Sequence, residues 1–242
     1  MSESNNSDSV LEIKNLLFTY HKHTKHAIID EVNFSIKKHE TISIAGPNGA
    51  GKTTFLKLLV GLLKPLKGSF FLNNKEIFHP RELLHSIGLV FQNPDEQVFF
   101  PKVEDDIAFS LRNLGLTDSE INESVHSVMH ALKITYLYGR SFFSLSFGEK
   151  KKVSIAGTLV TKPEILILDE PTIGLDPWSK AEFIDIIKNL ATETSLIIAT
   201  HDRDILNESN KVYFLWDGKF IRIFDNILNF DEFSKTFIPN RE

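Results

Sequence analysis

Residues 41–53 read TISIAGPNGAGKT, a short apolar strand that runs into a glycine-rich loop and then into a helical segment. The loop, residues 46–53, matches the pattern G-x-x-x-x-G-K-[ST]. Glycines let such a loop curl until its backbone N–H groups point at phosphate oxygens, and the helix that follows adds its positive end. The stretch therefore predicts a nucleotide-phosphate site, in which Lys52 contacts the β- and γ-phosphates and Thr53 offers its hydroxyl to Mg²⁺.

Strand and helix signals alternate on both sides of this loop. An antiparallel hairpin is expected over residues 11–18 and 28–36, and a helix over residues 52–63. Further strands are expected over residues 87–91, 165–168, 195–200, 211–216 and 219–223, the last two joined by an Asp217-Gly218 turn. Capping boxes formed by Thr117 with Glu120 and by Ser179 with Glu182 predict two helix starts. The pattern predicts an α/β core that holds an inserted helical lobe.

The same signals predict how the chain is divided. Residues 1–9 are expected to be a disordered tail, and residues 10–226 a single domain. Within that domain, residues 10–92 and 162–226 form the nucleotide-binding core, and residues 93–161 form the inserted helical subdomain. Residues 227–242 form a C-terminal extension, in which Phe230, Phe233 and Phe237 would dock as a short helix.

Two carboxylates follow the apolar strand near residue 165. Asp169 ends the strand and is expected to face Mg²⁺, because open parallel sheets place ligands at the carboxyl ends of their strands. Glu170 comes next and would polarise an attacking water. The alternative is that both are solvated acids at the end of a strand, before the turn at Pro171. The phosphate-binding loop favours the functional interpretation.

A serine-glycine segment, LSFGE at residues 145–149, precedes a helical run. Ser146 and Glu149 form an S-x-x-E capping box, so one interpretation is simply a well-capped helix. A hydroxyl and free N–H groups at a helix start also suit a phosphate anion. The two interpretations are compatible.

Six motifs then stand in one order: the loop at residues 46–53, Gln92, residues 145–149, Asp169-Glu170, GLDP at residues 174–177, and His201. On these motifs the chain resembles the ATP-binding subunit of an ABC transporter, over residues 13–223. The usual signature is L-S-G-G-Q, so Phe147 and Glu149 depart from it, whereas Ser146 and Gly148 remain. The resemblance implies a P-loop NTPase fold with a RecA-type core, an antiparallel β subdomain and an inserted ABC-type helical subdomain.

The resemblance also implies the roles of individual residues. Glu170 would be the general base, His201 would contact the γ-phosphate, and Gln92 would sense Mg²⁺ and water. The expected catalytic residues are Glu170, His201, Gln92 and Lys52. The expected Mg²⁺ ligands are Thr53, Gln92 and Asp169. The expected ATP contacts are Tyr20 (stacked on adenine), Gly46, Pro47, Asn48, Gly49, Ala50, Gly51, Lys52, Thr53, Thr54, Ser146, Gly148, Glu149 and Asp176.

In the family that the chain resembles, the signature acts on nucleotide held by a partner's phosphate loop. The resemblance therefore implies a head-to-tail dimer that encloses two ATP molecules, made with a second copy or a close relative. Asp176 would reach across to the other subunit.

The segment after Gln92, NPDEQVF at residues 93–99, narrows the subtype. Asn93 suits a helix N-cap and Pro94 the first helical position, which predicts a short helix. The segment looks like the extra helix of energy-coupling factor importers, which take up vitamins or cobalt and nickel ions. Membership would imply integral membrane scaffold and substrate-binding subunits as partners, a groove near residues 92–99 for their coupling helices, and a place at the cytoplasmic face of the cell membrane.

Other assignments stay open. One is the ATPase of another ABC transporter class, and another is a soluble ABC ATPase without a transport role. A chromosome-type member needs a long coiled coil, and no sustained heptad run is present. Intact Lys52, Asp169, Glu170 and His201 argue against a module that binds ATP without hydrolysing it.

Composition limits the partners. The chain has 242 residues, a net charge of −5 and no cysteine, which excludes disulfides and thiolate metal sites. Mild acidity gives no reason to expect nucleic acid or anionic lipid as a partner, and no apolar stretch approaches the roughly 18–20 residues that a membrane span needs. The lysines at 150–152 are expected on the exposed side of their helix, and the His-rich turn at residues 21–26 is interpreted as a polar loop rather than a metal site.

Overall fold

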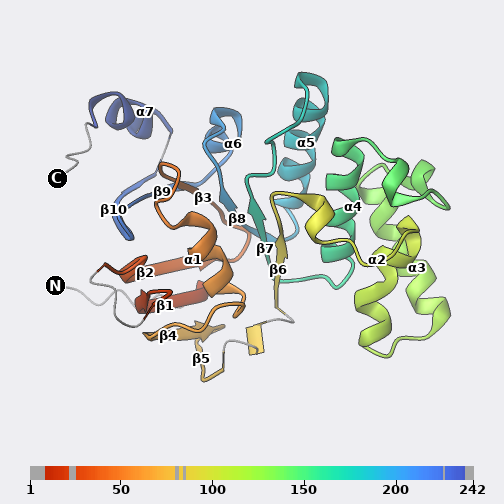
Figure 1. The fold of residues 1–242 in the computed structure, drawn as a ribbon, viewed down its shortest axis with the longest axis horizontal. Helices are drawn as coiled ribbons and strands as arrows, with labels where there is room; N and C mark the ends of the chain where they lie inside the picture. The colour runs from red at the N-terminus through yellow and green to blue at the C-terminus, as the bar shows by residue number, and fades with distance from the viewer. Residues whose placement is uncertain (1–8, 22–25, 80–81, 84–85, 226, 238–242) are drawn as a thin grey trace.

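A computed structural model describes residues 9–21, 26–79, 82–83, 86–225 and 227–237 of the chain. The tail expected over residues 1–9 lies outside this part, except for Ser9, which begins the first strand. Most of the turn at residues 21–26 and the last residues of the C-terminal extension also lie outside it. Figure 1 shows two sheets and a group of helices, with the sheets at one end and the helices α2, α3 and α4 at the other.

One sheet is antiparallel and has four strands in the order β2-β1-β4-β5. β1 (Ser9–Phe18) pairs with β2 (Ile29–Lys37), so the expected hairpin is confirmed. β4 (Lys67–Leu72) and β5 (Lys75–Ile77) extend the sheet and were not anticipated from the sequence. Asn73 and Asn74 both have positive φ angles, 49° and 64°, which form the tight turn between these two strands.

The second sheet has six strands in the order β10-β9-β3-β8-β7-β6. Its strands are β3 (Thr41–Ala45), β6 (Ile87–Val90), β7 (Ile165–Asp169), β8 (Ser195–Ala199), β9 (Lys211–Trp216) and β10 (Lys219–Phe224). All neighbours are parallel except β9 and β10. β3, β7 and β8 are buried along their whole length, as expected of a parallel sheet covered on both faces. The loops after β3, β6, β7 and β8 therefore leave the sheet at one edge.

Seven α-helices and three short 3₁₀ helices pack around these sheets in the described residues. The α-helices are α1 (Lys52–Leu59), α2 (Val103–Asn113), α3 (Asp118–Ala131), α4 (Phe147–Leu159), α5 (Pro177–Leu190), α6 (Arg203–Asn207) and α7 (Ile227–Thr236). The 3₁₀ helices are η2 (Pro94–Glu96), η3 (Thr135–Leu137) and η4 (Phe142–Ser144). α2, α3 and α4 follow one another between β6 and β7 and contact each other. α7 packs on β9 and β10 through an aromatic cluster that includes Phe214, Phe224 and Phe230.

The predicted start of α5 is wrong. The helix begins at Pro177, and its cap is Asp176, whose carboxylate accepts hydrogen bonds from the N–H groups of Trp178 and Ser179. Ser179 instead donates its hydroxyl to Asp176, and Glu182 pairs with Lys152 at 2.7 Å. An Asp cap with Pro at the first helical position is as good a start as a capping box, and it lies three residues earlier.

The expectation that the lysines at 150–152 are exposed is also wrong. Lys151 and Lys152 are only 2% and 6% exposed. α4 contacts α2, α3, β6 and η2, so this helix has little open surface near its start. The long aliphatic stems fill the resulting space, and the amines reach polar partners at its margin.

The apolar core that packs around α1 predicts a strong stability effect at Phe55. Its ring is fully buried in α1 and contacts Phe34 and Phe220, with ring centres 5.4 and 5.1 Å away. Phe55→Ala should lower the free energy of unfolding by about 3–5 kcal/mol, which chemical denaturation measures. Phe78→Ala is the matched control, because this ring is 77% exposed and its loss should cost no more than about 0.5 kcal/mol. Equal losses at the two positions would contradict this packing.

Candidate active site

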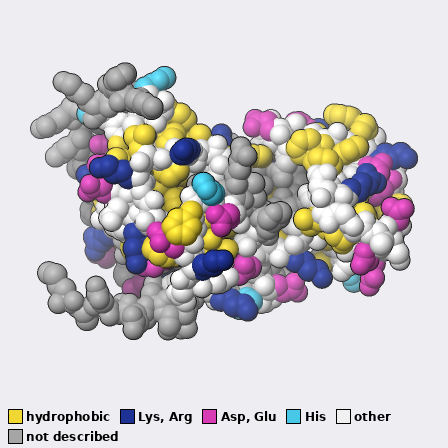
Figure 2. All heavy atoms as spheres, turned by 90° about the horizontal axis from the view of Figure 1, so that it is seen from below, with side chains coloured by type: hydrophobic (Ala, Val, Ile, Leu, Met, Phe, Trp, Pro, Cys, Tyr) yellow, Lys and Arg dark blue, Asp and Glu magenta, His cyan; other side chains and the backbone are white. Residues whose placement is uncertain are grey.

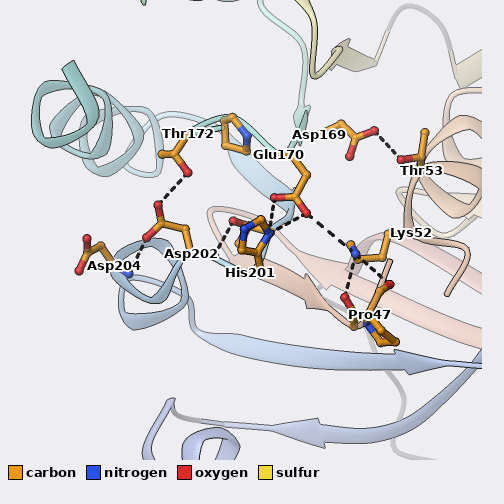
Figure 3. A network of polar contacts seen from close by, with 12 residues as sticks. Pro47, Lys52, Thr53, Asp169, Glu170, Thr172, His201, Asp202 and Asp204 are labelled. Atoms are coloured by element: carbon orange, nitrogen blue, oxygen red, sulfur yellow. Dashed lines mark hydrogen bonds and ion pairs between the residues drawn. The ribbon is translucent and has the colours of Figure 1, made fainter. Parts of the chain in front are cut away.

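The loops at the carboxyl edge of the six-stranded sheet bring five of the predicted residues together. Lys52 and Thr53 begin α1, directly after the loop that follows β3. Asp169 ends β7, Glu170 follows it, and His201 comes from the loop after β8 (Figure 3). Parallel pairing of β3, β8 and β7 makes this grouping a consequence of the sheet order. Sequence segments more than 100 residues apart thus form one polar cluster.

The phosphate loop depends on glycine at two positions. A Cβ atom at Gly46 would lie 2.3 Å from the backbone oxygen of Leu215, which no side chain tolerates. Gly51 has a φ angle of 102° and is the N-cap of α1, so this helix begins without a capping side chain. The helix start is therefore available to an anion rather than closed by its own side chain.

The Lys52 ammonium is folded back over this loop. Its Nζ donates to the backbone oxygens of Gly46 at 2.8 Å and Pro47 at 3.2 Å, and it lies 3.9 Å from Oε1 of Glu170. The side chain is only 9% exposed, so its charge acts in a medium that screens it weakly. The loop thus carries a preorganised cation beside the point where a phosphate chain would lie.

Thr53 and Asp169 form a pair suited to a divalent cation. The Thr53 hydroxyl donates to Oδ2 of Asp169 at 2.8 Å, and Oδ1 of Asp169 is buried without a hydrogen-bond partner among the described residues. Burial raises the pKa of the Asp169 carboxyl above its ordinary value, and the Thr53 hydrogen bond opposes that rise. An unpartnered buried carboxylate oxygen next to a hydroxyl fits the oxygen ligands that Mg²⁺ prefers.

Glu170 and His201 are in direct contact. Nδ1 of His201 lies 3.2 Å from Oε1 and 3.1 Å from Oε2 of Glu170. Glu170 is buried, whereas the His201 side chain is 67% exposed, so the imidazole stands between the carboxylate and solvent. The backbone of Glu170 has a φ angle of 46°, a left-handed conformation that is uncommon outside glycine and costs conformational energy.

A polar network holds the His201 loop and was missed in the sequence. The Thr172 hydroxyl donates to Oδ2 of Asp202 at 2.8 Å (Figure 3). Lys180 lies 2.9 Å from Oδ1 of the same carboxylate. Asp202 also caps α6 through the N–H of Asp204. The signal for it was an acid directly after His201 and a threonine directly after Glu170-Pro171, but only the fold brings them together.

Tyr20 and Gln92 lie at the margin of the cluster. The Tyr20 hydroxyl is 3.1 Å from the hydroxyl of Thr54 in α1, and its ring is 56% exposed, resting edge-on against Phe18. An exposed aromatic face beside the phosphate loop is suited to stacking with a base. Gln92 follows β6 at the same sheet edge and is exposed. Asn93, next to it, caps η2 as expected.

The serine-glycine segment forms the start of α4. Ser146 accepts a hydrogen bond from the N–H of Glu149, and Oε2 of Glu149 accepts from the N–H and hydroxyl of Ser146. The expected capping box is confirmed. Gly148 lies close to Ser179, and Phe147 packs on Gly174, where a Cβ atom would be 2.8 Å from the ring. No hydrogen bond or ion pair among the described residues joins residues 146–149 to the phosphate loop.

The comparisons with known proteins agree with this geometry. Residues 29–173 match the sequence family described as ABC transporter. The chain belongs to the ABC transporter ATPase family. The energy-coupling factor transporter ATP-binding protein EcfA of Methanocaldococcus jannaschii is 39% identical over 219 residues, which are 88% of this chain and 78% of that protein.

Two further proteins similar to this ABC ATPase carry names of the same kind. EcfA1 of Streptococcus pyogenes serotype M5 is 39% identical over 215 residues, 87% of this chain and 77% of the relative. The structure of cbiO1 from Clostridium perfringens, described as part of the ABC transporter complex cbiONQ, superposes with a TM-score of 0.85 at 36% identity. That match covers 93% of this chain and 92% of the other.

Family membership gives this ABC ATPase its activity. It binds nucleotide and hydrolyses ATP, and the fold is that of a P-loop NTPase cassette, as the sequence predicts. The resemblance to energy-coupling factor ATPases is confirmed at the level of these relatives. Within the described residues, none of the helices has the length and apolar character needed to span a bilayer.

Proposed function

We propose that this chain is the ATP-hydrolysing subunit of an energy-coupling factor importer, working at the cytoplasmic face of the cell membrane. It would drive uptake of a cobalt or nickel ion or a vitamin through integral membrane scaffold and substrate-binding subunits. The observation that carries the proposal is the buried cluster of Lys52, Asp169 and Glu170 with His201 at its mouth. The names of the matched relatives support the subtype.

Each residue of the cluster has a proposed task in hydrolysis. Lys52 and the backbone of the loop bind the phosphates, and Tyr20 stacks on the adenine. Thr53, Asp169 and Gln92 would hold Mg²⁺, which when bound offsets the negative charge of the phosphates. Glu170 removes a proton from the attacking water, and His201 holds that carboxylate and contacts the γ-phosphate.

The placement of the signature supports a pair of chains. α4, which begins with the signature, packs on α2 and β6, whereas α1, which begins with the phosphate loop, contacts β7 and β8. We infer that Ser146, Gly148, Glu149 and Asp176 act on nucleotide bound by a second copy or a close relative. The same proposal treats residues 10–92 and 162–226 as the nucleotide-binding core, residues 93–161 as the inserted subdomain, and residues 227–242 as an extension.

A groove between the core and the helices supports membrane partners. It has a volume of about 550 Å³ and is lined by β6, the segment after η2, α2 and α4, including Gly88, Phe99, Ser110 and Thr158. Gln97, which also lines the groove, joins two of its sides. Its side chain accepts a hydrogen bond from the N–H of Phe91 and donates one to the Thr158 hydroxyl in α4. We propose that this groove receives a coupling helix of the scaffold subunit.

Surface charge supports a protein partner over a nucleic acid or a lipid surface. On the face drawn in Figure 2, acidic and basic side chains alternate, and the exposed hydrophobic side chains gather in patches. Nucleic acids and anionic lipids attract surfaces with an excess of basic groups, and the chain carries a net charge of −5.

Ser110→Arg tests the proposed groove. A long charged side chain there should fill the groove and reduce recovery of the membrane subunits with the tagged chain by about ten-fold or more. ATP affinity should stay unchanged, because Ser110 lies on α2, away from the phosphate loop. Ser119→Arg, the same change on the exposed surface of α3, is the control and should leave recovery unchanged.

Two outcomes would contradict the assignment. Recovery of the wild-type chain without any integral membrane protein would favour a soluble ABC ATPase. Equal recovery of the membrane subunits by the wild-type chain and by Ser110→Arg would move the docking site elsewhere on the surface.

A further inference from the structure

Lys151 is a buried lysine that the proposed hydrolysis steps do not use. It lies in α4, one turn after the start of that helix, and is 2% exposed. Its Nζ donates to the backbone oxygen of Pro171 at 2.7 Å and to the backbone oxygen of Glu170 at 3.3 Å. No carboxylate in the described residues forms an ion pair with it. Its amine therefore binds two main-chain carbonyls, that of the proposed base Glu170 and that of the next residue, Pro171.

The segment that Lys151 binds includes a residue in an uncommon backbone conformation. Glu170 has a φ angle of 46°, and its N–H donates to the backbone oxygen of Ala199 in β8. Such a left-handed residue persists only where its surroundings hold it. Its backbone is thus fixed from two sides, by β8 at the N–H and by Lys151 at the oxygen, and the carboxylate direction follows from that backbone.

Keeping an amine at this position has a cost. Burial lowers the pKa of Lys151 to about 8, an effect that the negative charge of Glu170 partly opposes. The Phe147 ring lies 5.2 Å from Nζ and supplies a further favourable contact. An uncharged side chain of similar length would avoid the cost of burying the ammonium, so stability alone does not account for a lysine here.

Lys151 also joins two segments that the proposed dimer uses. Phe147, in the signature, covers Lys151 with its ring and packs on Gly174, the first residue of the GLDP segment. A shift of the start of α4 would therefore move the amine that holds the Glu170 carbonyl.

We propose that Lys151 is a positioning residue for hydrolysis. It fixes the main chain at Glu170-Pro171 and so couples the orientation of the Glu170 carboxylate to the position of α4. The inference rests on the proposed role of Glu170 as base. It predicts that loss of the amine lowers turnover and leaves ATP binding intact, because Lys151 contacts neither the phosphate loop nor Tyr20.

The test compares three variants of the full chain, assembled with its membrane subunits. Lys151→Met keeps the length and removes the donor, and Lys151→Gln keeps a neutral N–H donor on a shorter side chain. Lys152→Met is the matched control, since Lys152 is also buried in α4 but pairs with Glu182 on α5. Steady-state kcat and KM for ATP, direct ATP affinity and melting temperature are measured for each.

Lys151→Met should lower kcat by about ten-fold or more at a KM within about two-fold of the wild type, since small misplacement of a reacting group is costly. Lys151→Gln should restore kcat to about a third of the wild-type value. Lys152→Met should keep the wild-type kcat, whatever its melting temperature. If Lys151→Met does not fold, a lowered kcat at unchanged KM in Lys151→Gln carries the test.

Three results would overturn the proposal: a wild-type kcat in Lys151→Met, equal losses of kcat in Lys151→Met and Lys152→Met, or a loss confined to melting temperature. Failure of the proposed function would look different, because the wild-type assembly itself would then not hydrolyse ATP or would hydrolyse it equally well without Glu170.

Discussion

Glu170→Gln should abolish ATP hydrolysis while ATP still binds. The amide has the size of the carboxyl group but accepts no proton from water, so a contribution of about 10²–10⁴ in rate is lost. In the wild-type site Lys52 Nζ lies 3.9 Å and Nδ1 of His201 lies 3.2 Å from Oε1 of Glu170. We expect both neighbours to keep their places around the amide. Steady-state phosphate release measures the loss, and equilibrium ATP binding should remain within about three-fold of the wild type.

Glu164→Gln is the matched control for this substitution. Glu164 precedes the same strand, β7, but is exposed and accepts a hydrogen bond from Asn73 rather than facing the cluster. Its hydrolysis rate should equal that of the wild type. Undiminished turnover in Glu170→Gln would remove Glu170 from the role of base and transfer that role to another group.

Lys52→Met should weaken ATP binding by about 10²-fold and remove hydrolysis with it. The ammonium donates to the backbone oxygens of Gly46 and Pro47, and the side chain is 9% exposed. Charge-assisted hydrogen bonds in such surroundings are strong. The change also removes the ammonium that lies 3.9 Å from Oε1 of the buried Glu170 carboxylate. Titration calorimetry with ATP and Mg²⁺ measures the affinity.

Lys57→Met isolates the effect of position from the effect of charge. Lys57 lies in the last turn of the same helix, α1, and does not contact the loop carbonyls that Lys52 holds. Its ATP affinity should stay within about two-fold of the wild type. Wild-type affinity in Lys52→Met would show that the loop backbone alone binds the phosphates.

Local patterns predicted most of the fold because the parallel strands are continuous apolar runs and the phosphate loop has a fixed residue pattern. β3, β9 and the capping boxes at Ser146 and Thr117 lie where the sequence indicated. β4 and β5 were missed because they are short and half exposed, with mixed apolar and polar residues. Their turn at Asn73-Asn74 is the clearest signal that they do carry.

The residues of the site could be predicted where a sequence motif specifies them. Lys52, Thr53, Asp169, Glu170 and His201 meet because the strand order brings three loop ends together, which the motif order already implied. Two contacts could not be predicted from the sequence: that of Lys151 with the Pro171 carbonyl and that of Thr172 with Asp202. Both depend on how α4 and the His201 loop pack against the segment after β7. The charge of the lysines at 150–152 predicted exposure to solvent. Lys151 and Lys152 are buried instead, because α4 packs against neighbouring helices and strands.

The composition of the trapped ATP-bound state tests whether two of these ATPase chains enclose nucleotide between them. Glu170→Gln, isolated with its native ATPase partner in ATP and Mg²⁺, is analysed for mass and bound nucleotide. We expect two ATPase chains and two ATP molecules in one complex, which separates when ATP is withdrawn. A single ATPase chain that holds ATP without pairing would contradict this expectation, since the signature at residues 145–149 would then have no nucleotide to contact.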